Sequence, residues 1–358
     1  MTTATDGRER RGVSLAELTT LRIGGPARRL VHTARDEQVI EAVTTADRAG
    51  EPLLVIAGGS NLVIADAGFD GTALRIGTRG VTIEDRDDRA RLTAAAGEPW
   101  DELVSRCVGE GLAGCECLSG IPGSVGAVPI QNVGAYGQQV SETIVSVRAY
   151  DRETGRVVAL GHDDCGFGYR TSHLRHSARH VVLDVTFELA RSPLAQPVRY
   201  PELARALELD PGAQPPLAAV RAAVLALRSR KGMVLDPGDP DSVSAGSFFV
   251  NPILSSQRFA RLERRAAERL GPDARPPAWP EAGGIKTSAA WLIERAGFDR
   301  GFGVGRVGLS SKHTLALVNR GGATAEELIG LARQVRLGVQ EAFEVALEPE
   351  PTLVGISL

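Results

Sequence analysis

Residues 36–64 read DEQVIEAVTTADRAGEPLLVIAGGSNLVI, and this stretch decides the fold class. Apolar side chains recur at helical spacing up to Gly50, a residue type that commonly ends a helix. The apolar run PLLVIA follows as a predicted strand, then comes GGSNLVI, and TALRI is the next predicted strand. A helix that joins two strands within about forty residues is typical of a mixed α/β unit. The stretch therefore predicts a chain in which helices and strands share one core.

Length and composition narrow the class of protein. The chain has 358 residues, more than one hydrophobic core usually spans, so we expect two or three domains. Its formal net charge of −3 gives no overall attraction to nucleic acid or to an anionic membrane. No apolar run approaches the ~20 residues that span a bilayer, and the polar residues 1–12 are predicted to be a frayed arm. We therefore expect a cytoplasmic protein with no nucleic-acid partner and no membrane insertion.

The four cysteines do not form a metal-binding pattern. No CxxC pair with matching histidines occurs, and Cys115 and Cys117 are too close for an ordinary disulfide. We expect buried free thiols in a reducing cytosol and no metal site.

Two glycine-rich loops are candidates for binding phosphate. Gly58 and Gly59 follow an apolar strand, and two glycines let successive backbone N–H groups point at one spot. A plain Gly-Gly turn explains this segment equally well. The later loop IPGSVG, residues 121–126, has the same character. Together the two loops suit a diphosphate held from both sides, as in FAD.

Several charged and aromatic residues have a structural and a functional explanation. Arg170 follows the run GFGY and is either part of a structural ion pair or a cation for a bound anion. Glu348 and Glu350 lie two apart on an extended segment and so face one side, where surface carboxylates are the default. Two explanations also apply to a further set of residues. Each has either a structural role in the core or at the surface, or a contact with a ligand: Tyr136, Tyr200, Lys231 and His313.

The nonapeptide SAGSFFVNP, residues 244–252, places the hydroxyl of Ser247 between a glycine and two phenylalanines. A buried strand whose serine bonds to its own backbone is one explanation. A proton donor in a dry pocket is the other. In that case Gly246 lets the backbone approach a ligand, and Phe248 and Phe249 exclude water while strand alternation points them to opposite sides.

Taken together, these segments resemble the UDP-N-acetylenolpyruvoylglucosamine reductases, the MurB family of flavoenzymes. The segment RYPEL around Tyr200 looks like the tyrosine-bearing loop of the type I branch. The matching stretches occur in the family's order between Leu18 and Val354: TTLRIGGPA, GGSNLVIADAGFDG, SGIPGSVGAVPIQNVGAYG, CGFGYRTSHL, RSRKGMVLDP, SAGSFFVNP, SAAWLIERAG and LEPE.

The resemblance implies an α+β fold. It consists of a two-part FAD-binding domain of the vanillyl-alcohol-oxidase type and a smaller α/β substrate-binding domain. Residues 1–77 are expected to form the first FAD-binding subdomain, joined by the C-terminal strand 345–358. Residues 78–232 would form the second subdomain and residues 233–344 the substrate-binding domain. Pro351 has no N–H to give a ladder, so the sequence leaves the pairing of the last strand open.

The resemblance also implies the reaction and the residues that perform it. NADPH would reduce FAD, and hydride would then pass to C3 of UDP-N-acetylglucosamine enolpyruvate to form UDP-N-acetylmuramate for peptidoglycan. Arg170 is expected to contact the enolpyruvyl carboxylate, Ser247 to protonate C2, and Glu350 to be the acid beside that carboxylate. Expected cofactor contacts are Gly58, Gly59, Ser60, Asn61, Leu62, Pro122, Gly123, Ser124 and Gly126. Expected substrate contacts are Tyr136, Tyr200, Lys231, Asn251 and His313, in a protein expected to be a monomer.

Two other functions stay open at this point. A sugar or alcohol oxidase of the same cofactor-domain superfamily would often carry a histidine near the first phosphate loop for covalent flavin attachment, and GGSNL has none. A UDP-sugar-binding protein without redox chemistry is the other alternative. The yellow colour of a bound flavin would separate it from both enzymes.

Overall fold

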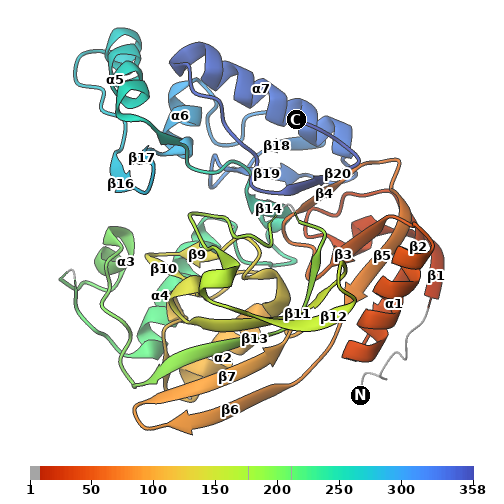
Figure 1. The fold of residues 1–358 in the computed structure, drawn as a ribbon. Helices are drawn as coiled ribbons and strands as arrows, with labels where there is room; N and C mark the ends of the chain where they lie inside the picture. Colours follow the sequence, from red (N-terminus) through yellow and green to blue (C-terminus); the bar gives the residue numbers. More distant parts are fainter. Residues whose placement is uncertain (1–8, 176, 211) are drawn as a thin grey trace. The chain divides into compact units, whose positions relative to one another are not determined.

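A computed structural model describes residues 9–175, 177–210 and 212–358, and these residues form two compact units. The first unit consists of residues 9–13, 27–59 and 69–230. The second consists of residues 14–26, 60–68 and 231–358. Each unit is therefore assembled from segments that are far apart in the sequence (Figure 1). The three-part division expected from the sequence stays a prediction.

The first unit contains the α/β arrangement that residues 36–64 predict. Its four-stranded sheet has the order β1 (Glu9–Ser14), β2 (Pro26–Thr33), β5 (Phe69–Ile76) and β3 (Leu53–Ile56). β2 and β3 both pair with β5 in parallel, and α1 (Asp36–Arg48) connects them. Val39 and Val43 of α1 are fully buried in the same core as Leu74 of β5. The predicted helix and strands are confirmed, because one apolar helix face covers a parallel sheet.

The frayed arm predicted for residues 1–12 is wrong for Glu9–Gly12. These residues belong to β1, the edge strand of the parallel sheet, where ladder hydrogen bonds replace solvation of the backbone. The Nε atom of Arg29 on β2 also lies 3.3 Å from the carboxylate of Glu9. Residues 1–8 lie outside the described residues.

The second sheet of the first unit is antiparallel. Its order is β12 (Arg156–Gly161), β11 (Ile144–Asp151), β13 (His180–Arg191), β7 (Arg89–Ala95) and β6 (Val81–Arg86), and β8 (Leu112–Ala113) also pairs with β13. β11 and β12 form a hairpin around the turn RETG, residues 152–155, where Asp151 pairs with Arg156. From Leu183 to Leu189 every second side chain of β13 is buried, which gives the sheet one core face; Val181 and Val182 are both buried, beside an irregularity in the pairing with β11.

Three helices and a small hairpin complete the first unit. The helices are α2 (Trp100–Gly109), α3 (Pro201–Ala206) and α4 (Leu217–Arg230), and the hairpin joins β9 (Gly134–Ala135) to β10 (Gln138–Gln139). The indole of Trp100 is 1% exposed and donates from Nε1 to the carbonyl of Leu118 at 3.2 Å. This bond fixes the start of α2 to the segment around Leu118, which leads into the glycine-rich loop of residues 121–126.

The second unit has three small sheets and three helices. The sheets are β14 (Ser244–Ser247), β19 (Ala316–Asn319) and β18 (Val307–Leu309); β15 (Ile253–Leu254), β17 (Gly284–Lys286) and β16 (Trp279–Glu281); and β20 (Thr352–Val354) with β4 (Leu62–Ile64). The helices are α5 (Ser256–Leu270), α6 (Ala289–Arg295) and α7 (Ala325–Phe343). Their apolar faces share one core with Phe248 and Phe249.

The start of α7 explains why residues 60–68 belong to the second unit. The helix begins with a capping box: Thr324 N donates to the Glu327 carboxylate at 2.9 Å, and Glu327 N donates to Thr324 Oγ1 at 3.2 Å. The Asp66 carboxylate accepts from Ala325 N at 2.8 Å and from Glu326 N at 3.1 Å. A carboxylate at a helix N-terminus is stabilised by the N–H groups and the dipole. Asp66 therefore ties its segment to α7.

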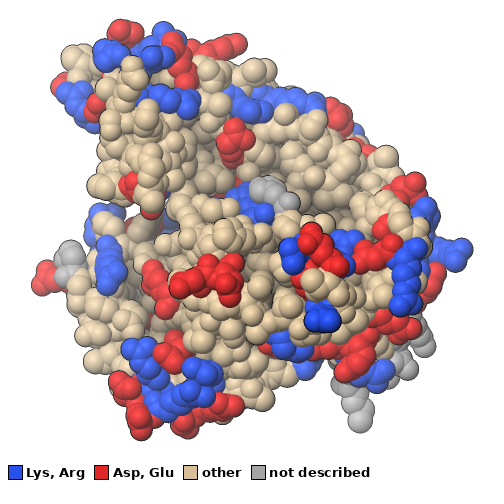
Figure 2. Space-filling model, in the orientation of Figure 1, with Lys and Arg blue, Asp and Glu red and all other residues tan. Residues whose placement is uncertain are grey.

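The surface carries both signs of charge. Acidic and basic side chains are interspersed over the visible face (Figure 2), in keeping with the net charge of −3. Among the described residues, each helix is too short or too polar to cross a lipid bilayer. Within the same residues the four cysteines are buried and free, and no group of three His, Cys, Asp or Glu side chains could hold a metal.

Candidate active site

The two predicted phosphate loops meet backbone to backbone in the first unit. A Cβ atom added to Gly58 would lie 2.6 Å from the Cα of Gly123, closer than any real side chain can approach. Gly59 has φ +62° and Gly123 has φ +124°, both in the region that favours glycine. These glycines are therefore required by the close approach of the two loops as well as by their turns.

Ser124 presents a buried hydroxyl at this junction. The residue is 5% exposed, and its Oγ has no hydrogen-bond partner within the described part of the chain. The backbone around it is anchored, since Val125 N donates to Glu98 O and Gly126 N donates to Ala96 O, both at 2.9 Å. A buried hydroxyl without a partner is costly unless a ligand supplies one.

The loop pair fits a diphosphate-bearing cofactor such as FAD. Backbone N–H groups at glycine turns form concave sites for anions, and the hydroxyl of Ser124 can donate to a phosphate oxygen. At Gly58 the backbone of Gly123 occupies the place of a side chain, so the two loops present main-chain groups side by side. The predicted contact residues Pro122, Gly123, Ser124 and Gly126 all lie in this one loop.

The second half of the first loop, residues 60–62, belongs to the second unit and has its contacts there. Asn61 lies in the second unit, where its Nδ2 donates to the carbonyl of Glu350 at 3.2 Å and its carbonyl accepts from Thr352 N at 3.0 Å. Beyond it, β4 pairs in parallel with β20, with Leu62 opposite Thr352. Pro351 precedes β20, so its missing N–H removes no bond from this ladder. The last strand is therefore paired.

Ser247 ends strand β14 and lies next to the segment that carries Glu350. Ser247 pairs with Ala316 of β19, and on the other side Glu350 N donates to the carbonyl of Phe248 at 2.9 Å. Val250 N donates to the Glu348 carbonyl at 3.0 Å. Ser247 and Glu350 are both half-buried. Two residues separated by a hundred positions are thus brought together by backbone pairing.

The two phenylalanines after Ser247 differ from the sequence prediction. Strand alternation predicts that Phe248 and Phe249 face opposite sides, and this is wrong. Both are 1% exposed, and their ring centroids lie 5.1 Å apart at 71°, because β14 ends at Ser247. Gly246 has φ +71°, and an added Cβ would meet nothing within 4 Å. The irregular backbone of β14 between Ser244 and Ser247 therefore favours a glycine here.

The Ser247 hydroxyl does not bond to its own backbone. Among the described residues no hydrogen bond reaches its Oγ, whereas the neighbouring Ser244 Oγ accepts from Gly246 N at 3.2 Å. In β14 the serine that bonds to nearby backbone is therefore Ser244, and the role of Ser247 stays a prediction.

Arg170 lies in a loop that docks on the GAYG hairpin of the first unit. Its Nη2 donates to the Gly134 carbonyl at 2.5 Å, and its φ of +53° is left-handed. Two further bonds hold the loops together: Asn132 Nδ2 donates to Gly168 O at 2.9 Å and Ser172 Oγ donates to Ile130 O at 2.7 Å. The guanidinium is thus held by the backbone of the loop that also carries Tyr136.

Tyr136 and Tyr200 form an aromatic pair in the first unit. Their ring centroids lie 5.5 Å apart at 85°, an edge-to-face arrangement. Tyr136 has φ +49°, and burial raises the pKa of its hydroxyl to about 12. Tyr200 is 41% exposed and precedes α3, which begins at Pro201. These two predicted substrate residues are therefore neighbours, from segments more than sixty positions apart.

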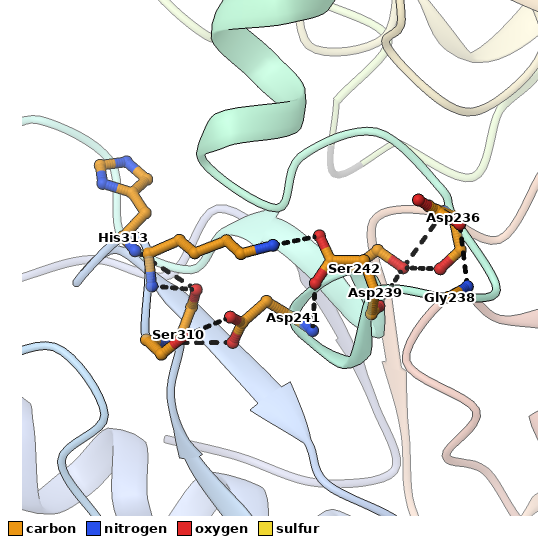
Figure 3. Close-up of polar contacts among 9 residues, drawn as sticks. Asp236, Gly238, Asp239, Asp241, Ser242, Ser310 and His313 are labelled. Atoms are coloured by element: carbon orange, nitrogen blue, oxygen red, sulfur yellow. Dashed lines mark hydrogen bonds and ion pairs between the residues drawn. The ribbon is translucent and has the colours of Figure 1, made fainter.

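The predicted substrate residues of the second unit are spread over three segments. Asn251 Oδ1 accepts from Ala289 N at 2.9 Å, which caps α6 and orients its amide. His313 follows β18, and its backbone N donates to Ser310 Oγ at 3.2 Å. Its ring points away from the polar cluster below it (Figure 3). Lys231 follows directly after α4.

The polar cluster that holds the His313 loop was not predicted from the sequence. The Asp241 carboxylate is 7% exposed and accepts from Ser311 N at 3.0 Å and from Ser311 Oγ at 2.6 Å. Lys312 Nζ donates to Asp239 Oδ2 at 2.8 Å, and this bond raises the pKa of Lys312 (Figure 3). The only sequence signal was the turn-rich acidic run DPGDPDS, which by composition is an ordinary loop.

Two family models match the chain. Residues 239–354 match UDP-N-acetylenolpyruvoylglucosamine reductase, C-terminal domain, and residues 27–161 match the FAD binding domain. The UDP-N-acetylenolpyruvoylglucosamine reductase of Thermobifida fusca is 56% identical over 350 residues, which cover 97% of this chain and 98% of that protein. The chain belongs to the UDP-N-acetylenolpyruvoylglucosamine reductase family.

Other members of the family are similar over the same length. The reductase of Mycobacterium tuberculosis is 49% identical over 357 residues, covering 97% of this chain and 95% of that protein. The crystal structure of the reductase from Thermus caldophilus superposes with a TM-score of 0.64 at 25% identity, covering 98% and 100% of the two chains.

Membership of the reductase family confirms the main expectations from the sequence. The α+β fold with an FAD-binding domain and a C-terminal reductase domain is confirmed, and so is FAD as the cofactor. The chain is an FAD-dependent oxidoreductase of this family. The oxidase and the non-redox binding protein are correspondingly disfavoured. The roles assigned to single residues stay predictions.

Proposed function

We propose that this chain reduces UDP-N-acetylglucosamine enolpyruvate to UDP-N-acetylmuramate with electrons from NADPH, a step of peptidoglycan precursor synthesis. The observation that carries the proposal is the identity of about half the residues, over nearly the whole length, with reductases of that name. The loop pair around Gly58 and Gly123 supports it, because it brings two glycine turns together beside the Ser124 hydroxyl, which has no partner among the described residues, and such groups suit a diphosphate.

The residues that would hold FAD are those of the two loops. They are Gly58, Gly59, Ser60, Asn61, Leu62, Pro122, Gly123, Ser124 and Gly126. When bound, FAD supplies the hydride that adds to C3 of the enolpyruvyl double bond, having received it from NADPH. The remaining steps concern what the chain's own side chains do to the substrate.

Three side chains act on the enolpyruvyl group in this proposal. The guanidinium of Arg170 neutralises the substrate carboxylate, into which negative charge spreads as hydride arrives at C3. Glu350 contributes as an acid beside the same carboxylate. Ser247 Oγ then gives its proton to C2 and regains one from solvent, so one hydride and one proton have been added across the double bond. A neutral hydroxyl suffices as donor because the developing carbanion is a strong base.

Binding of the nucleotide sugar is assigned to a separate set of residues. These are Tyr136, Tyr200, Lys231, Asn251 and His313. The Tyr136–Tyr200 pair offers hydroxyl groups and apolar ring surface, and Lys231 offers a cation suited to a diphosphate. We also propose that the enzyme works in the cytoplasm as a monomer. Size-exclusion chromatography with light scattering tests the oligomeric part.

The deciding experiment separates the two halves of the reaction. The yellow holoenzyme is reduced anaerobically with NADPH, and UDP-N-acetylglucosamine enolpyruvate is then added while flavin absorbance is followed. Rapid return of the oxidised spectrum with formation of UDP-N-acetylmuramate is expected. A reduced flavin that the nucleotide leaves unchanged, but that oxygen reoxidises rapidly, would instead favour the oxidase.

A further inference from the structure

Glu116 is a fully buried carboxylate that the reaction does not use. It lies in a short helical turn in the first unit and is 0% exposed. Its Oε2 accepts from Gly114 N at 2.7 Å, and its Oε1 accepts from Gln138 Nε2 and Gln196 N, both at 2.9 Å. Within the described residues no Lys, Arg or His forms an ion pair with it. A buried charge stabilised by N–H donors alone is costly and needs a reason.

The chemistry of its partners explains why this residue is a glutamate. All three partners are N–H donors, and an ionised carboxylate is the side-chain group that only accepts. A glutamine at the same place would turn its own NH₂ group toward at least one of these donors. Glu116 is thus matched to its site by hydrogen-bond polarity and not by volume.

The first arm of the Glu116 network reaches the hairpin that carries Tyr136. Gln138 is 6% exposed; its Nε2 donates to Glu116, while its Oε1 accepts from Cys117 N at 2.8 Å. Gln138 lies opposite Ala135 in the β9–β10 pair, and Tyr136 is in the turn between them with φ +49°. The network therefore fixes one side of a tight turn whose first residue has a conformation unfavourable for a tyrosine.

The second arm reaches the segment that carries Tyr200. The bond from Gln196 N anchors the chain four residues before Tyr200, and Ala195 N and Val198 N are bonded to the carbonyls of Pro215 and Ala213. One carboxylate oxygen, Oε1, thus joins the two segments whose tyrosine rings lie 5.5 Å apart.

We propose that Glu116 is a positioning residue for the substrate. Through its hydrogen bonds to Gln138 and Gln196 it fixes the two segments that carry Tyr136 and Tyr200. The proposal rests on the proposed function, since it assigns this tyrosine pair to the nucleotide sugar. Loss of the carboxylate weakens binding of the enolpyruvyl nucleotide and leaves transfer of electrons from NADPH to the flavin unaffected.

The test uses the FAD holoenzyme and a matched pair of buried carboxylates. Glu116→Gln is compared with Asp151→Asn, because Asp151 is 2% exposed in the same unit and accepts from Arg179 Nε at 2.9 Å and from Nη2 at 2.7 Å. Asp151→Asn thus removes a buried charge that is not in the tyrosine network. The dissociation constant of UDP-N-acetylglucosamine enolpyruvate is measured from its perturbation of the oxidised flavin spectrum, together with KM, kcat and the thermal midpoint.

Glu116→Gln is expected to raise the dissociation constant and KM about tenfold, the usual effect of losing one hydrogen bond to a charged group. Its kcat is expected to stay within about threefold, and flavin reduction by NADPH to be unchanged. Asp151→Asn should lower the thermal midpoint without a change in nucleotide binding. Equal binding by Glu116→Gln and wild type, or an equal loss in both variants, overturns the proposal.

A second variant covers the case in which Glu116→Gln fails to fold. Gln138→Leu keeps the carboxylate with its two backbone donors and removes the arm to the Tyr136 hairpin, and it also removes the acceptor of Cys117 N. It is expected to weaken nucleotide binding as well, and unchanged binding overturns the proposal equally. A wild-type holoenzyme that neither binds nor reduces the nucleotide refutes the proposed function itself, so the two failures are distinguishable.

Discussion

The two glycine-rich loops around Gly58 and Gly123 differ from the Ser247 segment in which atoms matter. In the loops it is the backbone, and in the Ser247 segment it is the side chains. At Gly58 and Gly123 two backbones touch, and the chemistry offered there consists of N–H groups and one hydroxyl. Around Ser247 the backbone is paired with two segments: Ser247 lies opposite Ala316 of β19, and residues 248–250 pair with residues 348–350. Its chemistry is carried by the side chains that project from this pairing. The loops can approach each other only because their glycines have no side chain. In the Ser247 segment, by contrast, the proposed chemistry depends on the side chains.

This difference predicts how each region fails. The loops should be damaged by substitutions that add atoms, because there is no room for a Cβ. The Ser247 segment should keep its structure when a side chain is shortened, because its register is set by backbone bonds, and should lose only chemistry.

Ser247→Ala tests the second half of this contrast and should have the largest effect. The variant is expected to bind FAD and to be reduced by NADPH at a near-normal rate. Reoxidation by the enolpyruvyl nucleotide should slow at least about a thousandfold, in the upper range for a lost general acid. Stopped-flow absorbance measures both half-reactions.

The matched control for this variant is Ser244→Ala on the same strand, whose Oγ accepts from Gly246 N. It should change reoxidation by a small factor at most. Normal reoxidation in Ser247→Ala would remove Ser247 from the mechanism.

Gly58→Ala tests the loops by adding one methyl group. A Cβ at 2.6 Å from Gly123 Cα must push the two loops apart, which typically costs about 1–3 kcal/mol. FAD affinity should therefore fall roughly ten- to a hundredfold, as measured by equilibrium dialysis of the apoprotein with FAD. Gly109→Ala is the control, because a Cβ there meets nothing within 4 Å. If both variants bound FAD like wild type, the close approach would be irrelevant to the cofactor.

Ser124→Ala should separate cofactor binding from folding. Removing a buried hydroxyl that has no partner among the described residues should leave the apoprotein as stable as wild type or slightly more stable. FAD affinity should fall about tenfold if the hydroxyl bonds to a phosphate.

In the control Ser119→Ala the lost hydroxyl donates to the Glu116 carbonyl at 2.7 Å, so apoprotein stability should fall. Thermal melts of the apoproteins and FAD titrations give both quantities. A Ser124→Ala variant with lower apoprotein stability and unchanged FAD affinity contradicts the assignment.

Of these variants, Lys312→Met should have the smallest effect, a change in thermal stability. It tests the loop that carries His313, beside the strand that ends at Ser247. The bond to Asp239 raises the pKa of Lys312 in the folded state, so its contribution to stability is fully present below the unfolded pKa of ~10.4. That contribution is lost as pH rises through the folded pKa. The gap in thermal midpoint between wild type and variant should therefore be constant up to about pH 10 and narrow above it.

Asp239→Asn is the partner variant and should reproduce the same narrowing, because the pair is one interaction. Melting curves between about pH 8 and pH 11, which bracket the lysine pKa, supply the measurement. A gap that persists unchanged at the highest pH would show that Lys312 acts through packing and not through its charge.

The candidate site was partly visible in the sequence for physical reasons. Glycines in a loop after a strand indicate special backbone conformations, so Gly59 and Gly123 can be marked from the sequence alone. The sequence could not show that Gly58 touches Gly123 or that Asn61 bonds to the carbonyl of Glu350, since such contacts depend on how distant segments meet. The roles of Glu116 and Asp241 could not be predicted from the sequence, because a single carboxylate forms no recognisable sequence motif.

Local rules also failed where tertiary packing overruled them. Alternation places successive strand residues on opposite faces, yet Phe248 and Phe249 lie in one core because the strand stops one residue earlier. Pro351 was a reason to doubt the last strand, but β20 begins just after it and pairs with β4.

By itself the sequence determined which elements form and which chemistry is available, because helical periodicity, glycine turns and the capping box at Thr324 act over a few residues. Only the tertiary structure decided that Glu350 pairs with Phe248, the residue after Ser247, and that Tyr136 lies against Tyr200. Such pairings are selected by burial of a common core and by completion of hydrogen bonds between segments far apart in the chain, and no local pattern encodes either.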